Sequence, residues 1–351
     1  MNFASDNWSG VAPQINESLT SNSVGVADAY GDSDLDKSVT NKFSEIFEKD
    51  VAVFFVGTGT IANSLSMALY SKPGGISMCH RESHMMEDEC GAPELFSGGG
   101  RLTGVDGALG KIDPEALHHK LDRFDPSFVH YGQASSVSIT QASEVGTVYT
   151  IEEIKAISEL AKAKSIPLHM DGSRFANALV HLDTTPAQMT WKNGVDILSF
   201  GGTKNGCWCA EAIVLFDLSV AEQMAYHHKR AGQLYSKSRF IAAQYDAYFR
   251  DGLWLELARH ANNMADNMRK GIADSQNARL GWQTQTNEVF CIFSNDIASK
   301  LREKGADFYE WHIPAAMKDT PQKDECLNRF VTSFATSTEE IDEMIAILNC
   351  S

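Results

Sequence analysis

The chain has 351 residues, of which 43% are hydrophobic and 22% are charged, and this is enough for one large core and a smaller second domain. Its 46 acidic and 30 basic residues give a net charge of −16 at pH 7. Such an acidic chain is poorly suited to nucleic acid or to an anionic membrane, so we expect neither as a partner.

Cysteine usage and hydropathy indicate the setting of the protein. Seven cysteines are scattered along the chain, an odd number that favours reduced thiols and a cytoplasmic protein. Cys207-Trp208-Cys209 lacks zinc-site spacing and a second ligand pair, so we expect no metal. No apolar run approaches the roughly 20 residues of a membrane span, and we expect no secretion signal, because the first residues lack basic and apolar regions.

The predicted elements follow a polar, irregular stretch over residues 1–35. From there helical and strand patterns alternate, which is typical of an α/β domain with a mainly parallel sheet. The apolar runs that predict strands are Val51–Val56, Ile76–Cys79, Phe128–Tyr131, Val137–Thr140, Pro167–Asp171, Val195–Phe200 and Ala212–Phe216.

Helix signals and a change of pattern divide the chain. Thr150 and Glu153 form a predicted capping box, as do Ser337 and Glu340. Beyond residue 250 a long helical stretch, two strands and a last helix predict a smaller α+β domain. We therefore expect an N-terminal arm over residues 1–20 that contributes to the active site, a large domain over 21–250 and a small domain over 251–351.

Lys204 is the first candidate for chemistry. It lies in the glycine-lined turn Gly201–Gly206 between two predicted core strands. A desolvated lysine there has a lowered pKa, and its amine can attack a carbonyl. Lys204 alone also fits an ordinary exposed turn lysine.

Asp171 strengthens this interpretation, because it ends the predicted strand Pro167–Asp171. Ligands of open α/β sheets bind at such strand ends, so Asp171 and Lys204 could share one pocket. A buried carboxylate beside a reactive lysine is what pyridoxal phosphate needs, since the carboxylate keeps the pyridine nitrogen protonated. Alternatively, Asp171 pairs with Arg174 or caps a helix.

A glycine loop after Val56 suggests a rival cofactor. The run from Gly57 to Ala62 matches G-x-G-x-x-A after a strand, and Glu82 follows another apolar run, in the outline of a dinucleotide fingerprint. Any helix N-terminus that binds phosphate also uses small residues. The pattern therefore does not decide between a dinucleotide, with two phosphates, and a cofactor with a single phosphate.

The ordered set of motifs resembles the threonine aldolases among the fold-type-I pyridoxal phosphate enzymes. It comprises Ser5-Asp6, Tyr30-Gly31-Asp32, Gly59-Thr60, His84, Asp171-Gly-Ser-Arg174 and Lys204 in SFGGTKNG. The likeness runs over nearly the whole chain. It implies a large cofactor-binding α/β domain, a small C-terminal domain, a pyridoxal 5'-phosphate cofactor and a homodimer or homotetramer.

The resemblance also implies a role for each matching position. Lys204 would hold the cofactor covalently, and Asp171 would hold its ring nitrogen. The phosphate would bind to Gly59, Thr60 and Thr203, with Lys237 or a second subunit assisting. His84 would lie over the ring, and Arg174 would also contribute to the cofactor site. Residues implied near the substrate are Ser5, Tyr30, Arg174 and Arg329, together with His130, which resembles a second active-site histidine.

The expected reaction is the cleavage of β-hydroxy-α-amino acids of the L-threonine, allo-threonine or phenylserine type to glycine and an aldehyde. A histidine would take the hydroxyl proton, because its pKa lies near neutrality, and the choice between His84 and His130 stays open. Two alternatives stay open as well. A β-eliminating lyase or racemase of the same fold would use Lys204 and Asp171 in the same way, and a NAD-dependent oxidoreductase would use the Gly57 loop and Glu82.

Overall fold

The structure is a computed structural model that describes residues 1–315, 317 and 319–349. Its larger sheet has seven strands in the order β1-β7-β6-β5-β4-β2-β3. The pairs from β6 through β3 are parallel, whereas β7 is antiparallel to both of its neighbours. The strands are β1 (Ala52–Val56), β2 (Gly75–His80), β3 (Arg101–Val105), β4 (Gln133–Thr140), β5 (Leu168–Gly172), β6 (Ile197–Gly201) and β7 (Glu211–Leu215). The predicted α/β fold with a mainly parallel sheet is confirmed.

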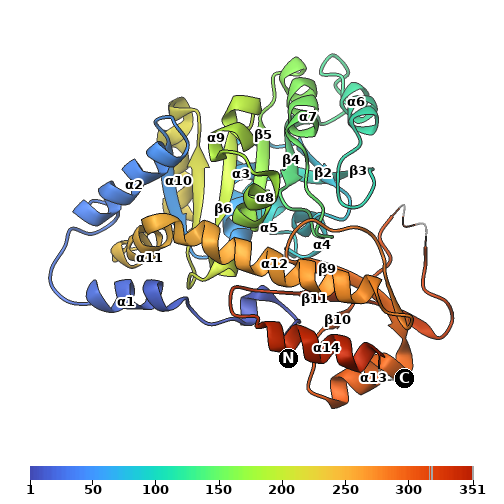
Figure 1. Cartoon of the computed structure of the whole chain (residues 1–351). Coiled ribbons are helices and arrows are strands. Elements are labelled where there is room, and N and C mark those ends of the chain that lie inside the picture. The colour runs from blue at the N-terminus through green and yellow to red at the C-terminus, as the bar shows by residue number, and fades with distance from the viewer. Residues whose placement is uncertain (316, 318, 350–351) are drawn as a thin grey trace.

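Helices connect these strands and cover the sheet (Figure 1). They are α2 (Asp34–Ile46), α3 (Gly59–Tyr70), α4 (His84–Glu87), α5 (Ala92–Phe96), α6 (Pro114–Arg123), α7 (Ile151–Ala163), α8 (Phe175–Leu182), α9 (Pro186–Met189), α10 (Ala221–Arg230) and α11 (Arg239–Phe249). The predicted capping box opens α7, because Glu153 N–H donates to Thr150 Oγ1 (3.2 Å) and Thr150 N–H donates to the Glu153 carboxylate (2.8 Å).

One predicted strand, Phe128–Tyr131, is wrong. These residues form turns, in which Phe128 N–H donates to Asp125 O (3.1 Å) and Tyr131 N–H donates to Phe128 O (3.1 Å). The aromatic and β-branched residues favour a strand, but the Asp125-Pro126 turn that precedes them prevails. The real strand, β4, starts at Gln133 and continues through the predicted Val137–Thr140.

Aromatic packing fixes the central strand β6 against the helices on one face. Phe200 of β6 is fully buried, and its ring centroid lies 5.3 Å from that of Phe43 on α2, 5.8 Å from that of Phe249 on α11 and 5.9 Å from that of Trp254. Such rings bury large apolar areas and hold defined geometry. The strand that leads to Lys204 is therefore held rigidly.

A second, antiparallel sheet follows in the order β10-β11-β9-β8. Its strands are β8 (Ala278–Leu280), β9 (Glu288–Ser294), β10 (Tyr309–Glu310) and β11 (Glu325–Val331), and the helices with it are α13 (Asn295–Glu303) and α14 (Thr338–Asn349). Figure 1 shows the long helix α12 (Leu253–Ala273) running below the large sheet toward this small sheet. Helix α12 packs against both α8 and α14 and so links the two layers.

The N-terminal arm joins the small sheet. Phe3 N–H donates to Asp307 O and Val331 N–H donates to Phe3 O, both at 2.8 Å, and the Phe3 side chain is fully buried. The arm then passes Ser5 and Asp6 before α1 (Pro13–Ser21) begins. Residues from both ends of the chain are thus brought to the strand ends of the large sheet.

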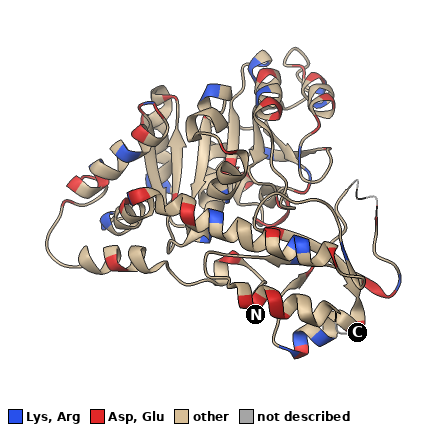
Figure 2. Ribbon diagram, in the orientation of Figure 1, with Lys and Arg blue, Asp and Glu red and all other residues tan. Residues whose placement is uncertain are grey.

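Charged residues are spread along helices and loops around both sheets (Figure 2). No described helix is long and apolar enough to span a membrane. Within the described part of the chain, no group of three or more His, Cys, Asp or Glu residues could hold a metal ion. The domain boundaries at residues 20 and 250 stay predictions.

Candidate active site

Asp171 and Lys204 lie at the same edge of the large sheet. Asp171 is near the carboxyl end of β5 and pairs in register with Ser199 of the parallel strand β6. The chain leaves β6 at Gly201, and Lys204 follows in the 3₁₀ helix Thr203–Asn205 before β7 returns. Ligands of such sheets bind outside the carboxyl ends of the strands, so both side chains stand where a cofactor would sit.

Asp171 is a buried carboxylate that is kept ionised. Its Oδ1 accepts hydrogen bonds from Ser173 N–H (3.0 Å) and Ser173 Oγ (2.7 Å), and its Oδ2 accepts one from Asn63 Nδ2 (2.8 Å). Burial alone would raise its pKa, but the hydrogen bonds from Ser173 and Asn63 and the nearby positive charge of Lys204 hold the pKa below its usual value. Such a carboxylate can hold a protonated ring nitrogen.

A cavity of about 340 Å³ contains Lys204. Within the described residues, the Lys204 amine makes no hydrogen bond or ion pair. The walls come from the arm, both sheets and the loops between them: Ser5, Asn7, Glu82, His84, Glu87, Asp88, Glu144, Val145, Arg174, Lys204, Glu288, Tyr309, Trp311, His312 and Arg329. Four of the predicted site residues, Ser5, His84, Arg174 and Arg329, are therefore brought together with Lys204.

His84 is linked to Asp171 through two residues that the sequence reasoning missed. The Asn63 side-chain amide donates both to Asp171 and to Glu89 Oε1 (2.9 Å), and Glu89 Oε1 lies 3.0 Å from His84 Nδ1. The hydrogen bond to Glu89 raises the pKa of His84. With Nδ1 held in this way, the other ring nitrogen, Nε2, is the one available to a ligand. The one available signal was helical spacing, since Asn63 lies one turn after Gly59 on α3.

Replacing Asn63 with Ala leaves two buried carboxylates without a shared donor. We expect Asn63→Ala to lower the free energy of unfolding by about 1–3 kcal/mol, as measured by urea unfolding. The matched control is Asn41→Ala on the exposed face of α2, which should change it by less than about 0.5 kcal/mol. Equal effects of the two substitutions would contradict a structural role for the Asn63 bridge.

The glycine loop forms the N-terminus of α3 beside Asp171. Thr58 caps this helix, since its Oγ1 accepts from Ile61 N–H (3.2 Å), and a Cβ added at Gly59 would lie 3.6 Å from Ser173 Oγ. A Cβ at Gly57 would lie 2.5 Å from the Tyr235 hydroxyl, so a larger residue there would require the Tyr235 side chain to move. Helix N-termini favour anions, so Gly59 and Thr60 are well placed for a phosphate.

Two further predicted residues lie near this loop but outside the Lys204 cavity. Thr203 uses its polar groups within the lysine turn, where its N–H donates to Glu211 Oε1 (3.3 Å) and its Oγ1 accepts from Ala210 N–H (3.2 Å). Tyr30 lines a different hollow, together with Gln233. Gln233 Oε1 accepts a hydrogen bond from Gly57 N–H (3.0 Å), so the hollow that Tyr30 lines lies on the phosphate-loop side.

The two arginines differ in how far their charges are already paired. Arg174 donates to both oxygens of the buried Asp6 (2.8 and 3.1 Å) and lies 3.3 Å from Glu288. Arg329 is farther from Glu288 (3.9 Å) and stacks on the Trp311 ring at 4.2 Å, and its Nε has no partner among the described residues. Arg329 is therefore the better carboxylate ligand, while Arg174 holds the arm in place.

His130 is not brought to the site within one chain. It precedes Gln133, whose N–H bonds Gly74 O at the start of β2, whereas His84 follows the end of the same strand. The His130 ring packs on that of Phe128 (centroids 4.9 Å apart). His130 and Lys204 thus lie toward opposite ends of the parallel strands, and His130 does not line the Lys204 cavity of its own chain.

The dinucleotide alternative is also contradicted by the sheet. Strand β1, which precedes the glycine loop, is at the edge of the sheet and pairs antiparallel with β7. A dinucleotide fold would place that strand centrally, with the next strand parallel beside it. The predicted ribose ligand, Glu82, instead accepts from Ala315 N–H (2.7 Å) and lines the Lys204 cavity.

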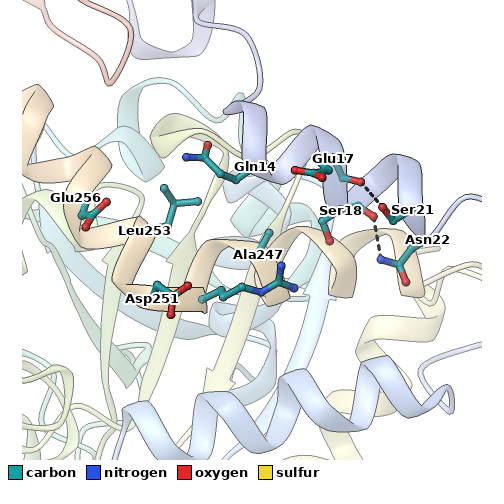
Figure 3. A pocket seen from close by; sticks show the side chains of 10 residues that line it. Gln14, Glu17, Ser18, Ser21, Asn22, Ala247, Asp251, Leu253 and Glu256 are labelled. Atoms are coloured by element: carbon teal, nitrogen blue, oxygen red, sulfur yellow. Dashed lines mark hydrogen bonds between the residues drawn. The ribbon is translucent and has the colours of Figure 1, made fainter.

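A second hollow, of about 360 Å³, lies between α1 and the turn from α11 to α12 (Figure 3). Its polar groups are partly satisfied within α1, as Ser21 Oγ donates to Glu17 O (2.9 Å) and Asn22 Nδ2 donates to Ser18 O (2.8 Å). Arg250 there pairs with Asp246. The residues that line this hollow include no lysine, histidine or cysteine, so we do not consider it a second candidate for catalysis.

Comparisons with known proteins agree with this geometry. The family described as "Beta-eliminating lyase" matches residues 2–295. The low specificity L-threonine aldolase of Pseudomonas aeruginosa is 39% identical over 97% of this chain and 95% of its own, and that of Pseudomonas sp. (strain NCIMB 10558) is 42% identical over 88% of each. A structure of Leishmania major threonine aldolase superposes with a TM-score of 0.91 at 25% identity, covering 99% of this chain and 98% of its own. The chain belongs to the beta-eliminating lyase family, within its pyridoxal phosphate-dependent threonine aldolase group.

Proposed function

We propose that this protein is an aldehyde-lyase that cleaves the Cα–Cβ bond of β-hydroxy-α-amino acids and releases glycine and an aldehyde. One observation supports the proposal above all. The cavity at the strand ends is lined by both Lys204 and Arg329, whose Nε has no partner among the described residues, and Asp171 lies at the same strand ends. The substrates we propose are L-threonine, allo-threonine and phenylserine.

The residues present fit pyridoxal 5'-phosphate. Lys204 would hold it covalently, Asp171 would hold its ring nitrogen, and the α3 N-terminus at Gly59 and Thr60, with Thr203, would hold its phosphate. When bound, the cofactor supplies an electron sink for the pair of electrons left on Cα when the bond to Cβ breaks.

The remaining residues would orient the substrate. Arg329 is proposed to bind the substrate carboxylate, with Ser5 and the Asp6–Arg174 pair closing that side. His84 is proposed as a catalytic residue that lies over the cofactor ring and contacts the β-hydroxyl through Nε2. Arginine suits this carboxylate because its planar fork binds two oxygens at once.

Glycine release from a panel of β-hydroxy-α-amino acids tests the function. We expect glycine and the matching aldehyde in equal amounts. Pyruvate and ammonia in place of glycine would instead support β-elimination, which the name of the matching family suggests as a second candidate. A panel that yields none of these products would overturn the proposal.

Arg329→Met should raise the KM for the amino acid roughly tenfold to a hundredfold, because a charge-assisted hydrogen bond to the carboxylate is lost. The control is Arg279→Met, since Arg279 pairs with Glu325 and Asp319 outside the cavity. Steady-state kinetics of both variants check this. An Arg329→Met enzyme with the parent KM would show that another residue binds the carboxylate.

We also propose a homodimer or homotetramer in the cytoplasm. Support comes from large apolar side chains that one chain leaves exposed, including Tyr30 and Trp208 at 53% and 61% exposure. Apolar surface of this kind is commonly covered by a partner. Light scattering that gives a single 38.5 kDa chain in an active preparation would contradict the oligomer.

A further inference from the structure

Glu144 is a carboxyl group in the cavity that neither the sequence motifs nor the proposed cofactor contacts explain. It follows β4, whose last residue, Thr140, pairs in register with Asp171. Glu144 lines the cavity that also contains Lys204 and His84. It therefore stands within the proposed active site without an assigned task.

The two oxygens of Glu144 are held very differently. Oε1 accepts hydrogen bonds from His84 N–H (2.8 Å) and from Thr140 Oγ1 (2.9 Å), which fixes the carboxyl plane. Oε2 is buried and has no hydrogen-bond partner among the described residues. A buried oxygen without a partner costs free energy and is rare, so a group that binds in the cavity is expected to supply the missing hydrogen bond.

Titration favours a proton carrier at this position. Burial raises the pKa of Glu144 to about 7, and the negative charge of Asp171 acts in the same direction, against the hydrogen bonds from His84 N–H and Thr140. The other titratable groups in electrostatic contact with Glu144 are Cys79, Tyr149 and Arg174. Efficient general bases have pKa values near the working pH.

His84 is suited to a complementary task. Its hydrogen bond with Glu89 raises its pKa, so the imidazole keeps its proton to higher pH than a free histidine. A protonated imidazole donates through Nε2 and cannot accept a proton there. The cavity thus contains a proton donor, His84, and a proton acceptor, Glu144. The two are held together at the start of α4, because His84 N–H donates a hydrogen bond to Glu144 Oε1.

We propose that Glu144 Oε2 takes the β-hydroxyl proton of the substrate and that His84 donates to the hydroxyl oxygen. This inference rests on the proposed function. As the O–H bond breaks, its electron pair forms the aldehyde C=O bond and the Cα–Cβ pair remains on Cα. Cα then takes up one proton, so that the proton lost from oxygen is balanced by the one gained in glycine.

The test compares the pH dependence of kcat in three enzymes that carry the cofactor: the parent, Glu144→Gln and His84→Gln. Because the ionised form of Glu144 is the active one, kcat of the parent should fall as pH drops through about 7. This fall is the acid limb of the pH profile. Glu144→Gln keeps the shape and the Oε1 contacts but cannot ionise, so we expect kcat to fall roughly a hundredfold or more and this acid limb to disappear. His84→Gln should lower kcat while the limb remains.

A matched control and a second readout separate catalysis from structure. Glu211 is likewise buried with its pKa raised to about 7, but it bonds the Thr203 backbone and lies outside the cavity lining. Glu211→Gln should therefore keep the acid limb. In infrared titration of the cofactor-free protein, Glu144→Gln should remove one protonated carboxyl band that titrates near 7, and Glu211→Gln should remove another.

Each outcome decides the inference. A limb that persists in Glu144→Gln and vanishes in His84→Gln would make His84 the base and overturn it. If Glu144→Gln does not fold, Glu144→Asp decides: a limb with a shifted midpoint supports the inference, and a rate independent of pH overturns it. A parent that releases no glycine from any substrate contradicts the proposed function itself, which is a separate failure.

Discussion

A Lys204→Ala enzyme will be colourless and will release glycine at less than about a thousandth of the parent rate. Lys204 is the lysine that lines the cavity, and the Phe200 cluster holds the strand that leads to it. Without the amine, the covalent attachment of the cofactor and the proton transfers at that nitrogen are both lost. The measurements are the visible absorption spectrum and glycine release.

Folding effects can be separated from this loss. The lysine turn is built from backbone and neighbouring side chains, since Asn205 Nδ2 donates to Tyr248 Oη (2.7 Å) and to Trp254 O (2.8 Å). Lys204→Ala should therefore keep the melting temperature of the cofactor-free parent, which is the right reference because a bound cofactor itself stabilises the folded state. Lys192→Ala, which removes an outlying lysine paired with Glu48, is the matched control and should stay coloured and active. A coloured and active Lys204→Ala would contradict the role of Lys204.

Asp171→Asn is the second variant with a large expected effect. It replaces a buried carboxylate that three hydrogen bonds orient, and it keeps the size of the side chain. The neutral amide lacks the negative charge that keeps the ring nitrogen protonated, so the electron sink is weakened. We expect kcat to fall roughly a hundredfold to a thousandfold, which is the effect of losing one preorganised electrostatic partner.

The spectrum should change as well as the rate. The cofactor should remain bound in Asp171→Asn, because Lys204 and the α3 N-terminus are intact. Its absorption maximum should nevertheless differ from that of the parent, and kcat should be lower. Asp183→Asn, in the turn after α8, is the control. If Asp171→Asn keeps the parent kcat and spectrum, the ring nitrogen does not contact this carboxylate.

Much of this site could be predicted from the sequence because its parts lie at strand ends and helix starts. Asp171 ends an apolar run, Gly59 opens a helix after another, and Lys204 lies in a glycine turn between two strands. Local patterns fix such positions, and the parallel sheet brings them to one edge. The prediction of a strand at Phe128–Tyr131 is wrong because these aromatic and β-branched residues favour a strand, whereas the preceding Asp125-Pro126 turn determines their conformation.

The missed residues are those whose role depends on tertiary contacts. Asn63 and Glu89 look like ordinary helix and loop residues, and only the fold shows that they join Asp171 to His84. Glu144 shows its unpaired oxygen only once β4 and α4 are in place. His130 is implied near the substrate only by the family resemblance, and in the fold it precedes β4, so within one chain it lies away from the strand ends that carry Asp171 and Lys204.

Borohydride reduction of the coloured protein, followed by peptide mass mapping, determines whether Lys204 carries the cofactor. The reagent fixes a cofactor that is bound through a carbon–nitrogen double bond to the lysine that carries it. We expect one modified peptide, with the mass increase on Lys204. A label on another lysine, or active protein with no label at all, would contradict it.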